Sequence, residues 1–559
     1  MKRLLAVLLL VAVAAAIVIV TLPPRRRALS APPAAAGVRG AMHIHTRRSD
    51  GSGLPDAIAA AAARAGLRFI ILTDHDDASS EPTRPYYRNG VLIIEGAEIS
   101  SDDGHVVALD LPRAPYPLAG ESRDVLEDVH RLGGFALAAH PGSEKAELAW
   151  RHWDEPFDGL EWLNGDSEWR DEPITTMLGA PLSYAFGRAG AVARLFDRPE
   201  PVLAKWDELT TRRRVVGVAA ADAHARIGLR SGEPDDPLLA VHLPSYEAVF
   251  SALSITVGAA VSGEAAADAR AILDAIRRGH VYSSVDALAA PAEMSFRAAA
   301  GAQPFEQGDE IRRRPEEIAL AVESNAPPDA RIVLLRNGRE VASAAGPHLR
   351  HVTDGGRATY RTEIHLAGAP GSPPVPWVVS NPIYVGLPPA AQDVRPAPTD
   401  VVLHYGNGPA DGWMAAASPR SLAVLDVIPG PGGTQLSLRY GLGGTLSESP
   451  YAALVAPTGA VKDYDRLVFT ARASTPMRLS VQVRVPSGGD GERWHRSVYL
   501  DEQPRDVTVF FDDMRPRGPT RQARPDLAAV HALMFVVDTV NTKPGSSGQV
   551  WIDDVRYGR

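Results

Sequence analysis

The chain has 559 residues, which is too long for one hydrophobic core, so about three or four domains are expected. Its net charge is -9, and no basic stripe indicates a nucleic-acid partner, so nucleic-acid binding is not expected. The sequence contains no cysteine, which excludes disulfides and thiolate metal ligands. Any bound metal must therefore be held by His, Asp or Glu.

The N-terminal segment has the pattern of an export signal. Lys2 and Arg3 precede an apolar run from Leu4 to Leu22. About 19 residues in a helix would span roughly 28 Å, close to the thickness of a bilayer core. We expect residues 1–37 to form a signal peptide or membrane anchor followed by a spacer rich in Pro and Ala. The globular part is then periplasmic or extracellular, and residues 4–22 anchor it to the membrane as a transmembrane helix if the signal is not cleaved.

From Gly37 the pattern alternates between apolar strands and helices. Such alternation predicts a parallel sheet or barrel. The expected helices cover residues 54–65 and 122–132. The expected strands cover residues 40–45, 67–73, 91–94, 105–109, 135–139, 159–163 and 215–221.

Potential metal ligands recur at the ends of these strands. His43 and His45 are two residues apart, as are Asp222 and His224, so in extended backbone each pair shares one face. The carboxyl ends of strands in an α/β barrel converge on one mouth. One histidine at a strand end is more often structural, but the repetition indicates shared metal ligation. The residues that would meet there are His43, His45, His75, Glu98, His105, His140, Asp222 and His224.

The order of these motifs resembles the PHP (polymerase and histidinol phosphatase) family. The resemblance covers about residues 38–290 and rests on His43-x-His45, Asp74-His75, Glu98, His140-Pro141 and Asp222-x-His224. It implies a distorted (β/α)7 barrel that binds two or three divalent ions, and Zn, Mn and Fe all accept such nitrogen and oxygen ligands. The stretch 377–384 also resembles exported members of the family, some of them grouped with carbaryl-hydrolase-like metallohydrolases.

The resemblance also implies how the ligands would be shared. Glu98 would bridge two metals. The first metal would be held by His43, His45, Glu98 and Asp222, the second by Glu98, His140 and His105, and the third by Asp50, His75 and His224.

Clustered divalent ions activate water, so a metal-dependent hydrolase is expected. Beyond Glu98, Asp76 could shuttle a proton and Arg226 could grip a phosphate, although a solvated arginine is an equally good interpretation of Arg226. Asp74 suits a role in orienting a ligand. A phosphoesterase acting on a small or polymeric phosphate ester is favoured. The alternatives are a carboxylic or carbamate ester hydrolase with the same site, and a non-catalytic surface protein that binds glycans.

An insertion separates the strand ending at Leu163 from the strand starting at Val215. It contains Trp169 and Trp206. Because it follows a strand, it could overhang the barrel mouth as a lid. A peripheral helical pair that packs one of the tryptophans is an equally good interpretation.

After residue 290 the helical pattern fades. We expect a small β-sandwich over residues 291–386, with a two-residue hairpin at Asn337-Gly338, and a Pro-rich linker over 387–400.

Residues 401–559 read as a β jelly roll. Met477 to Val485 alternates like a half-buried strand, and the ending 550–557 resembles the last strand of galactose-binding-like domains, which implies glycan contact. Trp494 and Tyr499 could form a sugar platform, but core packing is the better interpretation. Asp553 and Asp554 could hold a structural calcium or lie in a turn.

Overall fold

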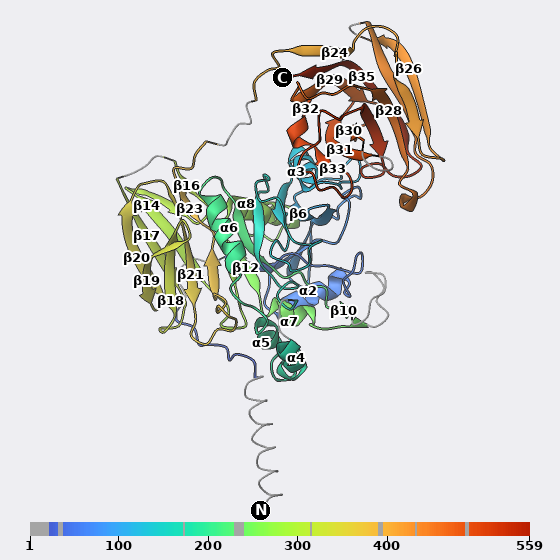
Figure 1. Ribbon diagram of the computed structural model, residues 1–559. Helices are drawn as coiled ribbons and strands as arrows, with labels where there is room; N and C mark the ends of the chain where they lie inside the picture. The colour runs from blue at the N-terminus through green and yellow to red at the C-terminus, as the bar shows by residue number, and fades with distance from the viewer. Residues whose placement is uncertain are drawn as a thin grey trace, which may run out of the picture. The chain divides into compact units, whose positions relative to one another are not determined.

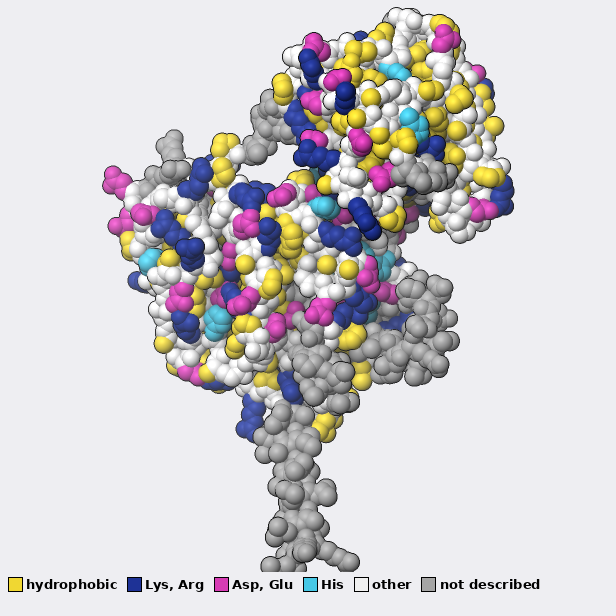
Figure 2. Space-filling view, viewed as in Figure 1, with side chains coloured by type: hydrophobic (Ala, Val, Ile, Leu, Met, Phe, Trp, Pro, Cys, Tyr) yellow, Lys and Arg dark blue, Asp and Glu magenta, His cyan; other side chains and the backbone are white. Residues whose placement is uncertain are grey.

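The computed structural model describes residues 22–31, 37–170, 174–228, 240–312, 316–389, 395–430, 433–486 and 491–559. It divides into two compact units: Met1–Pro112 with Glu121–Ala391, and Arg113–Gly120 with Gln392–Arg559. Basic and acidic side chains are interspersed on the face shown in Figure 2.

A large mixed sheet forms one side of the first unit's core (Figure 1). Its parallel part contains β1 (Val38–Ala41), β2 (Phe69–Leu72) and β4 (Val91–Glu95). On the other side of β1, β12 (Ser254–Val257) and β13 (Val281–Ser284) run antiparallel. β3 (Tyr86–Arg88) closes the edge beside β4.

A second, five-stranded sheet carries the remaining strands of the N-terminal region. The pairs β5–β6 and β6–β7 are antiparallel, whereas β7–β8 and β8–β9 are parallel. These strands are β5 (Ala97–Ser101), β6 (Gly104–Leu109), β7 (Phe135–Ala138), β8 (Gly159–Asn164) and β9 (Val216–Ala220). Side chains from both sheets share one core, including Met42, Ile71, Leu137 and Val218.

Helices are fewer than strands in the described chain. They are α2 (Pro55–Arg64), α3 (Ser122–Arg131), α4 (Ile174–Phe186), α5 (Arg188–Ala193), α6 (Glu200–Thr210), α7 (Tyr246–Phe250) and α8 (Ala265–Arg278). α2 begins at a proline, which loses no hydrogen bond in the first turn. α8 ends at Gly279, whose φ of 77° suits a left-handed cap.

The predicted (β/α)7 barrel is wrong, although most of its strands and helices lie where expected. Among the described residues, strands make up 40% and helices 14%, so a helix does not follow each strand. β4, β5 and β6 follow one another without a helix between them, and the strands divide into two sheets of mixed direction. Strand periodicity alone does not encode pairing direction, which is why local elements were predictable and their assembly was not.

The insertion after β8 forms helices, and Trp206 on α6 is fully buried. Its indole lies against Gly217 on β9, where a Cβ would approach within 2.3 Å of the ring, and Nε1 donates to the Val215 carbonyl at 2.9 Å. Trp206 therefore has the packing role. Residues 171–173 of this insertion lie outside the described residues.

Residues 291–386 form strands that pair antiparallel with one another except for one parallel pair, and the hairpin prediction is confirmed. Asn337 and Gly338, with φ of 50° and 77°, connect β18 (Arg331–Arg336) to β19 (Arg339–Ala345). The other strands are β14 (Met294–Ala300), β15 (Gln303–Glu306), β16 (Glu310–Ile311), β17 (Glu317–Ser324), β20 (His348–Asp354), β21 (Ala358–His365), β22 (Val378–Ser380) and β23 (Ile383–Val385). β22 pairs with β13, so the large sheet continues across residue 290. The domain boundary at that residue stays a prediction.

The C-terminal unit is a two-sheet β-sandwich, coloured orange to red in Figure 1, as the jelly-roll prediction requires. One sheet contains β24 (Val401–Tyr405), β26 (Leu422–Gly430), β27 (Gly433–Gly441), β35 (Ser547–Gly558), β29 (Arg466–Ala473) and β32 (Arg505–Phe510). The other contains β25 (Met414–Ala417), β28 (Tyr451–Pro457), β34 (Ala532–Asp538), β30 (Met477–Val485), β31 (Glu492–Leu500) and β33 (Arg515–Pro516).

The two short strands β10 (Ile227–Gly228) and β11 (Ala240–Val241) belong to the first unit.

Two sequence expectations for this unit change. β30 is buried on both faces rather than half-buried, apart from Arg484. Trp494 is fully buried in the core, so it cannot serve as a sugar platform.

The transmembrane expectation is corrected as far as the described chain allows. Among the described residues, no helix is both long enough and apolar enough to cross a membrane. The predicted span at residues 4–22 lies almost wholly outside them. Export stays a prediction.

A buried ion-pair network joins α6 to β21. Arg361 donates to both carboxylate oxygens of Asp207, at 2.6 and 2.7 Å, and to Glu363 at 2.7 Å. Arg198 also donates to Glu363, at 2.9 and 3.1 Å. Burial alone would raise the pKa of Glu363, but its hydrogen bond with His365 and the charges of the two arginines hold that pKa well below its usual value.

Replacing Glu363 by Gln should therefore destabilise the protein at neutral pH by about 2–3 kcal/mol, because the buried Arg361 and the half-buried Arg198 lose a charged acceptor. A carboxylate whose pKa is depressed on folding stabilises above its unfolded pKa of about 4.3, and that stabilisation is lost as the pH falls below this value. The difference in melting temperature between wild type and Glu363→Gln should be largest at pH 7 and smaller at pH 4. A constant difference would contradict the assignment. The exposed Glu317→Gln is the control.

Candidate metal centre

Three predicted ligands follow directly on the ends of strands and have unusual backbone. His43, His140 and Asp222 have φ of 60°, 30° and 42°, in the left-handed region that non-glycine residues rarely adopt. They lie just beyond β1, β7 and β9. Such strain costs about 1–3 kcal/mol per residue and persists mainly at functional sites.

The two histidines of the first motif reach the centre differently from the prediction. β1 ends at Ala41, so His43 and His45 do not share the face of a regular strand. Instead the left-handed turn at His43 redirects the chain, and Ile44 forms an isolated parallel bridge to Ala223. A second isolated bridge joins His75 to Glu98, so both bridges link the two sheets at the ligands.

A buried carboxylate orients His43. Glu161 on β8 lies 2.6 Å from His43 Nδ1, and since the carboxylate only accepts, Nδ1 carries the proton. The other oxygen of Glu161 accepts from the backbone N–H of His140 and from Asn164 Nδ2, both at 2.8 Å. Glu161 thus fixes one imidazole and the strained backbone of another, leaving the Nε2 lone pair of His43 directed at the centre.

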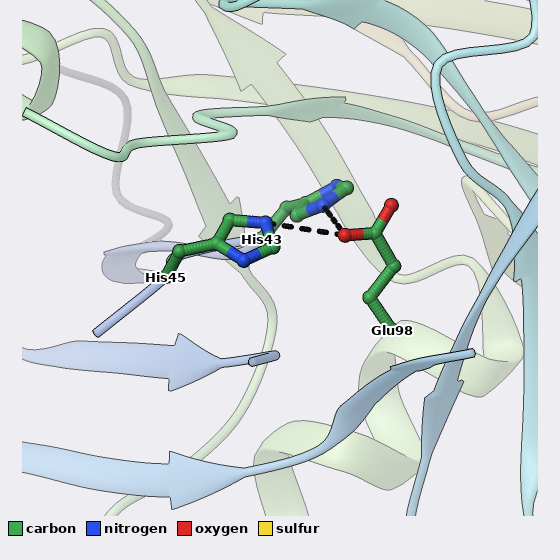
Figure 3. Close-up of side chains that lie close together, drawn as sticks. All are labelled: His43, His45 and Glu98. Carbon is green, nitrogen blue, oxygen red and sulfur yellow. Dashed lines mark ion pairs between the residues drawn. The ribbon is translucent and has the colours of Figure 1, made fainter. Parts of the chain in front are cut away.

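Four atoms surround one point at this centre. Glu98 Oε2 lies 3.2 Å from His43 Nε2 and 3.2 Å from His45 Nε2, and both imidazoles point to this oxygen in Figure 3. Asp222 Oδ1 lies 3.4 and 3.3 Å from the same two nitrogens. The two nitrogens and Asp222 Oδ1 are fully buried and make no hydrogen bond. Buried polar atoms without partners are rare in native proteins and call for an unseen group.

The spacing of these atoms suits a metal ion. If four atoms about 3.3 Å apart are arranged as a tetrahedron, each lies about 2.0 Å from their common centre; if they form a flat square, each lies about 2.3 Å from it. Zn–N and Zn–O bonds are about 2.0–2.2 Å long, so an ion at this centre would be at bonding distance. The nitrogen and oxygen donors also suit Mn and Fe.

The second oxygen of Glu98 faces two further histidines. Oε1 lies 2.8 Å from His105 Nδ1 and 2.8 Å from His140 Nε2. Glu98 therefore presents one oxygen to each of two neighbouring sites, as a bridging carboxylate must.

The remaining predicted ligands surround Asp50. Its Oδ2 lies 3.1 Å from His224 Nε2 and 3.8 Å from His75 Nε2, and its Oδ1 lies 3.2 Å from His45 Nδ1. The nine predicted ligands are thus brought together. Eight of them fall in overlapping groups whose donor atoms lie within metal-binding distance, and His140 lies next to these through Glu98 Oε1. Asp74 accepts from Thr46 N, Thr46 Oγ1 and Ser49 Oγ, and so holds the turn that carries Asp50.

Charge within the cluster is strongly coupled. Burial alone would lower the pKa of His43, but the surrounding carboxylates, Asp222 first, hold that pKa well above its usual value. Burial alone would raise the pKa of Glu98, but the charge of His43 and hydrogen bonds from neighbouring histidines hold it well below. In His75, burial lowers the pKa. The carboxylates therefore stay ionised, as metal ligands must.

Glu161 was not predicted as a site residue. Its only signal in the sequence is a charged residue inside the apolar strand Gly159–Asn164, where burial without a partner would be costly. That signal gives no partner, because His43 is 118 residues away.

The predicted catalytic residues other than Glu98 lie at the rim. Asp76 is exposed next to His75 and accepts from Ala78 N at 2.5 Å. Arg226 is half-buried, two residues after His224.

The C-terminal candidates lie apart from these ligands in the sequence and in a different unit. Asp554 forms an ion pair with Arg556, so one of the two carboxylates predicted to hold calcium already has a cationic partner. Tyr499 is half-buried and its ring lies 6.4 Å from that of Tyr116.

No family model and no curated protein matches the chain. Among solved structures it is similar to the family 11 carbohydrate-binding module of a cellulosomal cellulase of Clostridium thermocellum, with 16% identity over 29% of this chain and 97% of that chain, at a TM-score of 0.25. A carbohydrate-binding module described for specific mannan recognition matches with 13% identity over 29% of this chain and 99% of that chain, at a TM-score of 0.20.

The comparisons give no evidence for the PHP family, so the resemblance seen in the motif order stays a prediction. The metal centre stands on its geometry alone.

Replacing Glu161 by Gln should weaken metal binding about 10–100-fold, because residues that orient metal ligands contribute that much to affinity. Gln can still donate or accept one hydrogen bond, but it does not fix the His43 tautomer. Metal affinity of the purified full chain, measured by competition with a chelator, checks this. The exposed Glu323→Gln is the control, and equal affinity in both variants would contradict the role.

Proposed function

We propose that the N-terminal unit binds two or three divalent metal ions and hydrolyses an ester bond. The observation that supports this most directly is the ring of His43 Nε2, His45 Nε2, Glu98 Oε2 and Asp222 Oδ1, three of which are buried without a hydrogen-bond partner. His105 and His140 extend the ring on the side of the other Glu98 oxygen, and Asp50, His75 and His224 extend it on the side of His45.

Bound divalent ions supply acidified water and a Lewis-acid contact for a substrate oxygen. The chain's own groups prepare this chemistry. Glu161 keeps the His43 proton on Nδ1, so the lone pair of Nε2 remains available to bind a metal ion. Asp76 is exposed on a cavity of about 360 Å³ that His75 and Arg48 also line, and its carboxylate can pass a proton to the leaving oxygen.

A phosphate ester is the favoured substrate class, because clustered ions can hold several oxygens of one phosphoryl group and Arg226 can contribute charge. A carboxylic or carbamate ester would use the same donors. A panel of p-nitrophenyl phosphate, bis-p-nitrophenyl phosphate and p-nitrophenyl acetate, tested with Zn, Mn and Fe, separates these substrates. Faster turnover of the acetate would favour the second class.

Asp222→Asn should lower turnover on the preferred ester at least about 100-fold, because a neutral amide is a poor metal ligand. The control is His348→Ala, which removes an exposed histidine on β20. If the metal-loaded wild type hydrolyses none of the esters in the panel, the hydrolase proposal is wrong.

Metal content offers an independent check. Wild type should contain more than one equivalent of divalent metal, and the double variant His43→Ala with Glu98→Ala should contain far less, since Glu98 serves two sites. Elemental analysis of the purified protein measures this directly. An unchanged content in the double variant would show that the ions bind elsewhere.

A second candidate function concerns the C-terminal unit. We propose that this unit binds glycans. The observation that favours this is an open groove on one face of its sandwich, lined by an indole and several polar side chains. Alone, this would make the chain a non-catalytic surface glycan-binding protein; with the metal centre, it would hold the enzyme on a polymer.

A further inference from the structure

The groove lies on the sheet formed by β27, β35 and β29, and its volume is about 500 Å³. That volume is within the range of about 300–1,000 Å³ typical of small-ligand sites. Its lining residues come from strand positions and from two neighbouring loops, and they include Asn407, Gln435, Arg472, Trp551, Asp553, Asp554 and Arg556.

Strand alternation turns Trp551 outward. Its neighbours Val550 and Ile552 are fully buried in the sandwich core, whereas the indole is only partly buried. Directly across the ladder, Arg472 pairs with Trp551 in register, and its guanidinium lies 3.6 Å from the centroid of the ring. This cation–π contact fixes the indole on the face of the sheet.

A β-bulge sets the directions of the Asp553 and Asp554 side chains. The register between β29 and β35 shifts between Val468 and Thr470, and Asp554 has a φ of 53°. Asp553 consequently lies opposite Thr470 on the groove side, while Asp554 pairs with Arg556. The groove thus combines one aromatic surface with carboxylate acceptors and with guanidinium and amide donors.

We infer that this groove binds a neutral oligosaccharide, with Trp551 as the platform and Asp553 as a hydroxyl acceptor. A pyranose has an apolar face of C–H bonds, which packs on an indole, and a rim of hydroxyls, which need both donors and acceptors. Two arginines and two aspartates in the lining balance in charge, so a polyanion gains no net attraction. This inference rests on the proposed glycan binding and locates it.

The test uses affinity electrophoresis and calorimetry of the full chain with soluble mixed-linkage β-glucan, β-mannan, xylan and galactan, and with polygalacturonate as the anionic comparison. At least one neutral polymer should bind, and Trp551→Ala should weaken that binding at least tenfold. Asp553→Asn should weaken it severalfold and provides a second, milder variant. Met414→Ala removes an exposed apolar side chain from the other sheet and should change nothing.

The outcomes separate the two ideas. Binding of a neutral polymer that is equal in wild type, Trp551→Ala and Asp553→Asn overturns the groove but leaves glycan binding by this unit standing. No binding of any polymer overturns both. Preferential binding of polygalacturonate overturns the neutral ligand class. Melting temperature and turnover on the small ester should stay unchanged in every variant, which shows that a lost interaction is not lost folding.

Discussion

The N-terminal unit gathers buried carboxylates at one point, and these carboxylates need positive charge beside them. The carboxylates of Glu98 and Asp222 are buried and ionised, and the imidazoles that face them leave Nε2 atoms without partners. Protons on the imidazoles can meet this demand, and so can divalent ions. Protons and metal therefore compete for the same atoms, and metal binding should release protons. The strained backbone at His43, His140 and Asp222 is tolerated because it aims these groups at one point.

Residues far from the motifs hold this arrangement in place. The stretch 377–384, singled out in the sequence for its resemblance to exported hydrolases, has a structural explanation. Asn381 is buried and exchanges hydrogen bonds with both backbone groups of Gly217 on β9, at 2.8 Å each, and also donates to Val281 on β13. Tyr384 donates to the carbonyl of Val215 and accepts from its N–H. This late segment thus fixes β9, the strand that leads to Asp222.

Sequence reasoning predicted local structure, and which side chains lie together at the candidate centre, better than it predicted assembly. Continuous apolar runs located β2 and β7, which are buried on both faces, and helical periodicity located α3, each to within a few residues. Pairing direction leaves no such pattern, so the barrel was wrong. The gathering of the nine ligands could be predicted because several strands ended in the same residue types. The role of Glu161 could not, because a single buried carboxylate does not reveal its partner.

The pairing of β13 with β22 has a consequence for dissecting the chain. Ser283 and Ser284 bond through the ladder to Val379 and Val378, and the indole of Trp377 donates to the carbonyl of Ala289. A fragment ending near residue 290 would lose these partners. The backbone donors and acceptors along that edge of β13 would then be exposed and unpaired. Exposed strand edges pair with strands of other chains, so this fragment should aggregate even though it keeps every predicted histidine ligand.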